Sequence, residues 1–287
     1  MHPLVKWTAL TLAICLPLSA QAHRAWMLPS ATVLSGEDPW VTVDAAVSND
    51  LFYFEHFSMI IAGVGDVSTQ PAGQRARQAA ELLVMAPDGS QIKPQNGAIG
   101  RYRSTFDLHL TQKGTYKLAI ANSGLFASWK EGQENKRWMG KAEDLAKQVP
   151  ANAKELKVTQ NNRRMEVFVT SGNPSTDVLK TTGAGLELAP ITHPNDLFAG
   201  EAAEFSLLLD GKPAAGVEVS VIPGGNRYRD ELGEIKTTSD AAGKISITWP
   251  HAGMYWLEAE FTTREGVSAP ATERRASYSA TLEVLAP

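Results

Sequence analysis

Short segments in which apolar and polar residues alternate fill the chain after residue 23, and clusters of Gly, Pro, Asn and Asp separate them. A period of two places every second side chain on the same face, which is typical of half-buried β-strands. Turn-forming clusters stand where hairpins need them: Pro87-Asp88-Gly89, Asp210-Gly211-Lys212-Pro213, Pro223-Gly224-Gly225 and Asp240-Ala241-Ala242-Gly243. Many short strands with few helices predict sandwiches or barrels.

The expected strands are spread over both halves of the chain. They are residues 41–47, 82–85, 104–110, 116–121, 165–170, 203–209, 217–222, 235–238, 244–249, 255–261 and 278–285. Helix is scarce, and the best candidate is 141–148, which stops before Pro150. The expected fold class is therefore all-β.

Two blocks of the sequence share one pattern. Alternating apolar residues that begin at Phe106 lead to Tyr116, and alternating apolar residues that begin at Ile245 lead to Tyr255. Both pairs of equivalent residues are 139 positions apart. This internal repeat predicts that the same unit of strand, turn and tyrosine corner occurs twice in the chain. Independently arisen hairpin patterns are the alternative explanation. Either explanation gives two β-sandwich domains, immunoglobulin- or transthyretin-like.

Residues 1–22 have the pattern of a secretory signal peptide. Lys6 precedes an apolar run over 9–18, and the small-residue site Ala20-Gln21-Ala22 follows. The run is too short to span a bilayer as a mature anchor. We expect cleavage after Ala22, export to the periplasm and a mature chain that begins at His23.

Two domains are expected in the mature chain. Gly and Pro crowd residues 171–196, which is typical of a domain boundary. The predicted N-terminal β-sandwich domain, with loop helices, covers 23–175, and the predicted C-terminal β-sandwich domain covers 176–287.

Cysteine content, charge and motifs exclude several kinds of function. The single cysteine, Cys15, lies in the predicted signal peptide, so the mature chain lacks thiolates for zinc, catalysis or disulfides. The 27 basic and 31 acidic residues give a net charge of −4, which does not favour binding to the phosphate backbone of nucleic acid.

No later apolar stretch approaches ~20 residues, so we expect no membrane insertion of the mature chain. Hydrolase, dinucleotide, phosphate-loop and zinc-peptidase motifs are absent, and no enzyme activity is predicted.

His23 is the first candidate metal ligand. A histidine at a free amino terminus offers two tethered nitrogens, the α-amine and imidazole Nδ1, and nickel, cobalt or copper suits such donors. If residues 23–28 form a strand, Met27 shares a face with His23 and approaches the same site. A histidine left at the terminus by chance, with nothing bound, is the alternative.

His56 is the second candidate. It lies in the aromatic run Phe52-Tyr53-Phe54-Glu55-His56-Phe57, in which a strand would place it beside Phe52 and Phe54. An apolar surrounding is common for a metal-binding imidazole, although an ordinary core or surface histidine is the alternative. Glu55 is a weaker candidate ligand. His193 is expected to cap or bridge the domain junction, and His109 and His251 are expected to be surface residues.

Three blocks of the sequence resemble a bacterial family. They are Ala22-His23-Arg24-Ala25-Trp26-Met27-Leu28-Pro29-Ser30, Asn49-Asp50-Leu51-Phe52-Tyr53-Phe54-Glu55-His56, and the segment from Asp240-Ala241-Ala242-Gly243-Lys244 to Trp249-Pro250-His251-Ala252-Gly253-Met254-Tyr255-Trp256-Leu257. The family is a domain of unknown function, commonly filed as the periplasmic component of a cobalt or nickel uptake system. The resemblance implies a soluble periplasmic accessory that binds a divalent metal ion and exchanges it with a membrane metal transporter.

The first functional hypothesis is therefore a periplasmic nickel- or cobalt-binding protein whose ion is held by His23 and His56. A second hypothesis is a copper oxidoreductase, because an amino-terminal histidine paired with another histidine resembles the copper brace of lytic polysaccharide monooxygenases. A third is a non-enzymatic envelope protein whose tandem domains mediate contacts beside an outer-membrane receptor.

Overall fold

The computed structural model describes residues 23–66 and 79–287. The predicted signal peptide, 1–22, lies outside the described residues. Within them the chain forms strands β1 to β19, one α-helix, α1 (Ala142–Gln148), and the short 3-10 turns η2 (Asp177–Leu179) and η3 (Asn226–Tyr228). The all-β prediction is confirmed. In the described parts, none of the helices has the length and apolarity needed to cross a membrane.

The strands form three sheets. The first small sheet contains β1 (Arg24–Pro29), β3 (Trp40–Ser48), β4 (Phe57–Ser58), β7 (Gln95–Ile99) and β8 (Ser104–His109). The second small sheet contains β12 (Leu186–Pro190), β13 (Ala202–Leu209), β14 (Lys212–Pro213) and β17 (Lys244–Thr248). A ten-stranded sheet, here called the shared sheet, contains β2 (Val33–Leu34), β5 (Leu82–Met85), β6 (Gln91–Ile92), β9 (Gly114–Glu131), β10 (Glu134–Gly140), β11 (Lys154–Ser171), β15 (Glu218–Pro223), β16 (Ile235–Thr238), β18 (Gly253–Thr263) and β19 (Glu273–Val284).

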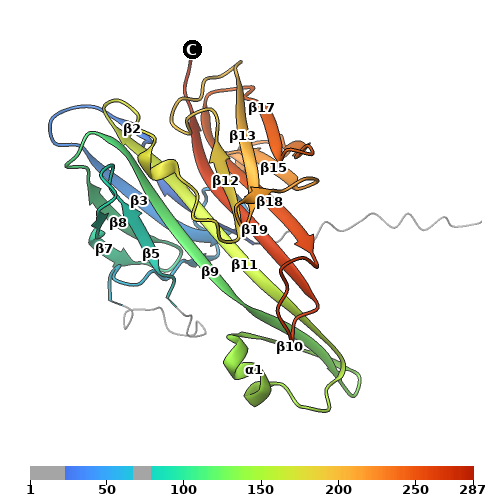
Figure 1. Cartoon of the computed structure of the whole chain (residues 1–287). Coiled ribbons are helices and arrows are strands. Elements are labelled where there is room, and N and C mark those ends of the chain that lie inside the picture. Colours follow the sequence, from blue (N-terminus) through green and yellow to red (C-terminus); the bar gives the residue numbers. More distant parts are fainter. Residues whose placement is uncertain (1–22, 67–78) are drawn as a thin grey trace, which may run out of the picture.

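The shared sheet serves both halves of the molecule. Its long strands β9, β11 and β19 run side by side through the middle of Figure 1, with β3 and β8 on one side and β13 and β17 on the other. The two halves join where β11 pairs in parallel with β19. One sandwich forms between the shared sheet and the first small sheet, and another between the shared sheet and the second small sheet.

Strand registers show that the two small sheets cover opposite faces of the shared sheet. In β11, Met165 and Val167 face the first core, and Met165 pairs with Ser279. Arg164 pairs with Tyr278, which belongs to the second core. Because neighbouring positions in a strand point to opposite faces, the two cores lie on opposite sides of one continuous sheet.

A smaller apolar cluster fixes β1 against the shared sheet. Trp26 of β1 and Trp256 of β18 are both buried there, together with Ile222 of β15. Each indole is also hydrogen-bonded: Trp26 Nε1 donates to Ser48 Oγ at 2.8 Å, and Trp256 Nε1 donates to the carbonyl of Ala25 at 3.2 Å. The start of β1 therefore lies close to β18, in the other half of the chain.

Strands β9 and β11 extend beyond the cores as an arm. They are 18 residues long, whereas the sequence predicts strands only over 116–121 and 165–170. Much of the arm is exposed on both faces, so the alternation that identifies a half-buried strand fades there. The predicted helix over 141–148 is confirmed, and it lies on this arm as α1.

The repeated tyrosine corner is confirmed. Tyr116 Oη donates to the carbonyl of Gln112 at 3.1 Å and accepts from its amide at 2.7 Å. Tyr255 makes the same two contacts with His251, at 2.8 and 3.3 Å. Each hydroxyl therefore satisfies both backbone groups of the residue four positions earlier, a feature of immunoglobulin-like sandwiches.

Replacing either tyrosine with phenylalanine is expected to destabilise the protein by about 1–3 kcal/mol, because the ring stays buried while two backbone groups lose their partner. Urea unfolding of Tyr116→Phe and Tyr255→Phe checks this. Wild-type stability in both variants would show that water replaces the hydroxyl at no loss.

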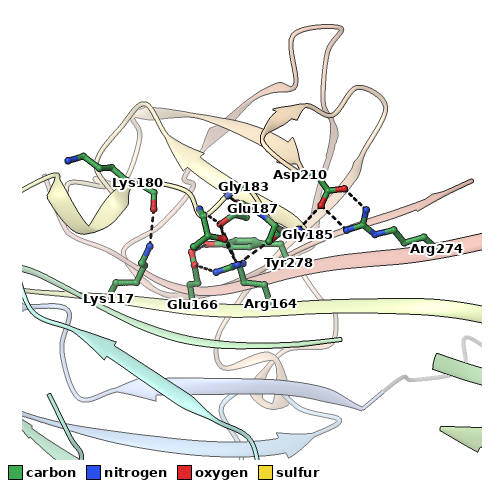
Figure 2. A network of polar contacts seen from close by, with 12 residues as sticks. Lys117, Arg164, Glu166, Lys180, Gly183, Gly185, Glu187, Asp210, Arg274 and Tyr278 are labelled. Atoms are coloured by element: carbon green, nitrogen blue, oxygen red, sulfur yellow. Dashed lines mark hydrogen bonds and ion pairs between the residues drawn. The ribbon is translucent and has the colours of Figure 1, made fainter. Parts of the chain in front are cut away.

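A network of buried charges lies on the second face of the shared sheet (Figure 2). Arg164 contacts Glu166 of its own strand at 3.2 Å and Glu187 of β12 at 3.4 Å, and the three side chains are 10%, 5% and 3% exposed. Tyr278 Oη donates to Glu166 at 3.1 Å. Burial raises the pKa of the Glu166 carboxyl, although Lys117 and Arg164 oppose the shift.

Glu187 also organises the loop that precedes β12. Its Oε1 accepts hydrogen bonds from the amide and hydroxyl of Thr182, and its Oε2 accepts from the amides of Gly183 and Ala184. One carboxylate thus links this loop to β11 through Arg164.

The predicted boundary segment, 171–196, contains structure that the sequence analysis missed. Strand β12 lies inside it and pairs with β13 of the second small sheet. The division into 23–175 and 176–287 stays a prediction.

His193 links β9 to the segment that follows β11. Its Nε2 lies 3.1 Å from both Thr115 Oγ1 and the Ser175 carbonyl, and its Nδ1 accepts from the Asn195 amide. Burial lowers its pKa, which favours the neutral ring.

Candidate functional site

His23 lies immediately before β1 and is exposed. Strand β1 pairs antiparallel with β3, and the pairing of Arg24 with Ser48 brings the start of β1 next to the end of β3. His23 Nδ1 lies 2.7 Å from Asn49 Oδ1, just beyond that end. The antiparallel pairing thus sets the position of the His23 ring.

His56 reaches the same place through β4. Phe57 of β4 pairs with Val47 of β3, which brings the preceding residue close to the end of β3. The rings of His23 and His56 are stacked, with centroids 3.9 Å apart and an interplanar angle of 29°. The Phe57 ring lies 4.4 Å from that of His56 and 6.2 Å from that of His23. The structure therefore brings the two candidate histidines together.

The aromatic surroundings of His56 differ from the prediction. Residues 51–56 form a turn and bends rather than a strand, and Phe52 has a φ of 60°. This left-handed residue breaks the alternation that would have placed Phe52 and Phe54 beside His56. Both phenylalanine rings instead lie 5.5 Å from the ring of Trp26.

Met27 does not approach the site, and that prediction is wrong. Its side chain is fully buried in the first core, and it pairs with Ala45 in the middle of β3. Met27 does lie on the strand face that the alternation predicts. However, it lies four positions along the chain from His23, about 13 Å at ~3.3 Å per residue, so its thioether serves packing.

Glu55 organises the loop beneath the histidines. Its Oε1 accepts hydrogen bonds from the backbone amides of Asn49 and Asp50, at 2.8 and 3.0 Å. Asn49 in turn contacts His23. The structure therefore gives Glu55 a role in positioning Asn49, and its proposed role as a ligand has no support from these contacts.

The side chains alone do not complete a metal centre. Among residues 23–66 and 79–287, no group of three or more His, Cys, Asp and Glu side chains gathers in a way that could hold a metal ion. The paired imidazoles of His23 and His56 supply two nitrogen donors. A third nitrogen at the same place is the α-amine of His23, which is free only after cleavage at Ala22.

A cavity of about 390 Å³ adjoins His23. Its lining comprises His23, Arg24 and Ala25, residues of β9, β11, β18 and β19, and Val47, Met59 and Ala80. The sequence analysis missed this cavity. A signal was present in β19, where the polar residues Arg275, Ser277 and Ser279 alternate with apolar ones. Their partners across from them in β11, Asn161 and Arg163, lie in a continuous polar stretch.

The two remaining histidines lie elsewhere. His109 contacts Asp38 and stacks on Trp40 with ring centroids 4.3 Å apart, so it is only partly exposed. His251 is exposed, and its backbone belongs to the second tyrosine corner. Neither contacts the histidine pair.

Comparisons with known proteins give a family but no function. Residues 20–263 match the profile of a family described as a domain of unknown function, DUF4198. No curated protein matches the sequence significantly.

Solved structures give only distant likenesses. The D0-D1 domain of Intimin has 11% identity and a TM-score of 0.22, over 90% of this chain and 97% of that one. A marsupial T cell receptor has 10% identity and a TM-score of 0.19, over 93% and 74%. Escherichia coli alpha-2-macroglobulin activated by porcine elastase has 10% identity and a TM-score of 0.19, over 90% and 31%. Superpositions this poor carry no argument about function.

Proposed function

We propose that this chain, which belongs to the DUF4198 family of domains of unknown function, is a soluble periplasmic accessory that binds a divalent transition-metal ion. The ion is held by the α-amine and imidazole of His23 and by the imidazole of His56. Nickel and cobalt are the proposed ions, and the accessory exchanges them with a membrane metal transporter or an outer-membrane receptor.

One observation carries the proposal. Two histidines that are 33 positions apart in the sequence stack at 3.9 Å, at the residue where the predicted cleavage frees an amine. The contacts that arrange them are specific: β4 pairs with β3, Asn49 contacts His23, and Glu55 holds the Asn49 backbone. Nitrogen donors of this kind suit borderline divalent ions.

The donor set fits such an ion. The α-amine and Nδ1 of one histidine are tethered to each other, which lowers the entropy lost on chelation. Binding at Nδ1 requires this nitrogen to leave Asn49 Oδ1, with which it is now in contact. Acidification releases the ion because protons compete for all three nitrogens. The role is therefore capture and release without turnover.

Replacing His56 with alanine is expected to weaken nickel binding by about tenfold, or about 1.4 kcal/mol, because one of three donors is lost. The measurement is calorimetric titration of protein that begins at His23 with Ni²⁺, Co²⁺ and Cu²⁺ in turn. His251→Ala is the matched control, since it removes an exposed histidine from the second sandwich. Equal affinities in wild type and His56→Ala would refute the paired site.

Copper is the ion that would change the class of the protein, because two imidazoles and an amine also match a copper brace. The same titration addresses this second candidate. Selective copper binding accompanied by peroxide consumption would replace the accessory role with an oxidoreductase.

A further inference from the structure

The cavity beside His23 has a floor whose composition follows from strand register. Across β9, β11, β19 and β18, one row of paired residues consists of Asn122, Arg163, Ser277 and Glu260. The next row consists of Ile120, Met165, Ser279 and Glu258. All eight residues line the cavity. The floor is therefore the part of the shared sheet that spans both halves of the chain, and it is largely polar.

Arginines dominate the charges of this cavity. Among the described residues, no carboxylate lies within ion-pair distance of Arg24 or Arg163, while Arg275 is paired with Glu260 at 2.5 Å. Arg164 reaches across the sheet to the buried network on the other face. Arg24 donates to the Asn49 carbonyl at 3.4 Å and lies over the Trp256 ring. The positive charges of Arg24 and Arg163 are therefore not neutralised by a carboxylate in direct contact.

The surroundings of Glu258 show that these arginines converge. Glu258 lines the cavity, and burial together with the neighbouring charge of Glu260 raises its pKa to about 7. The charges of Arg24, Arg275 and Arg163 act on the same carboxyl in the opposite direction. All three arginines also line the cavity that Glu258 lines.

We propose that this cavity binds a small oxyanion, a carboxylate- or phosphate-bearing molecule, with Arg24 and Arg163 as its principal partners. Guanidinium groups present paired donors that match carboxylate and phosphate oxygens. Ser277 and Asn122 add neutral donors on the floor. A volume of about 390 Å³ falls within the ordinary range of small-ligand sites. This inference goes beyond metal binding and does not depend on it.

Glu258 makes anion binding depend on pH. The charged and titratable groups around it are His23, Arg24 from β1, Arg163 from β11, Glu218 from β15, Glu234 just before β16, Lys236 from β16, Glu260 from β18 and Arg275 from β19. Above pH 7 the ionised carboxyl repels the ligand, and below pH 7 it is neutral. The anion therefore binds more tightly at pH 6 than at pH 8, with uptake of a proton.

The experiment is calorimetric titration of metal-free protein that begins at His23 with succinate, citrate and inorganic phosphate at pH 6 and pH 8. We expect Arg163→Gln to weaken binding by about tenfold or more. Arg137→Gln, an equal loss of charge at an exposed position on the arm, is the matched control and should bind as the wild type does. Glu258→Gln, which carries no charge at either pH, should bind the anion more tightly than the wild type does at pH 8.

The outcomes separate this inference from the proposed function. Binding of any of the three anions that Arg163→Gln weakens supports the cavity, and the preferred anion identifies the oxyanion class. No binding at millimolar concentration at pH 6, or equal binding by Arg163→Gln, overturns it. Because metal is absent throughout, failure of the metal site leaves these results unchanged.

Discussion

Replacement of Glu187 by alanine is expected to lower the free energy of unfolding by about 3–5 kcal/mol. The Glu187 side chain is 3% exposed, contacts Arg164 at 3.4 Å and accepts four hydrogen bonds from the loop at Thr182, Gly183 and Ala184. Alanine leaves the buried Arg164 guanidinium with Glu166 as its remaining carboxylate and leaves three backbone amides without a partner (Figure 2). Urea unfolding followed by tryptophan fluorescence measures the loss.

Glu155→Ala is the matched control for this prediction. Glu155 also forms an ion pair, with Lys130 at 3.0 Å, but its side chain is 65% exposed and lies on the arm. Exposed pairs contribute about 0–1 kcal/mol, so the control should change little. If Glu187→Ala lost no more stability than Glu155→Ala, the network would not be what secures β12 to the shared sheet.

A protein that retains Ala22 before His23 is expected to bind nickel about 100-fold more weakly than one that begins at His23, a difference of about 2.7 kcal/mol. The extra residue converts the α-amine of His23 into an amide, which is a poor donor, and it destroys the tethered pair of nitrogens. The extension leaves the side chains of His23, Asn49 and His56 unchanged, so we expect their ring contacts to persist. The measurement is competition with a chelator of known affinity.

The matched control adds one alanine after Pro287, which changes length without changing the first residue. It should bind nickel as the unextended protein does. If the protein with the amino-terminal extension bound nickel as tightly as the unextended protein does, the ion would be held by the imidazoles alone. The proposed role of the His23 α-amine as a ligand would then be wrong.

Much of the fold was predictable because local pattern and tertiary structure agree. Each predicted strand overlaps an observed one, and the spacing of Tyr116 and Tyr255 identified both tyrosine corners. The missed elements have physical causes. Strand β12 lies among Gly and Pro residues, which predict turns. The arm of β9 and β11 lacks a buried face over much of its length. The sharing of one sheet by both halves depends on the parallel pairing of β11 with β19, which local pattern does not encode.

The candidate site was predictable only in part. The proximity of His23 and His56 follows from β4 pairing with the end of β3, which the aromatic run did not reveal. The prediction for Met27 failed because two residues on the same strand face need not lie close together. The Met27 side chain is buried in the first core, away from His23. Arg24 and Arg163 are 139 positions apart in the sequence, so only the assembled sheet places them in one cavity.

Native mass spectrometry of the protein isolated from the cells that naturally produce it tests the metal-binding account most directly. The account predicts a polypeptide whose first residue is His23, carrying one divalent ion that is lost on acidification. A different first residue, or a correctly processed chain that carries no ion and takes up none from nickel, cobalt or copper salts, would contradict it.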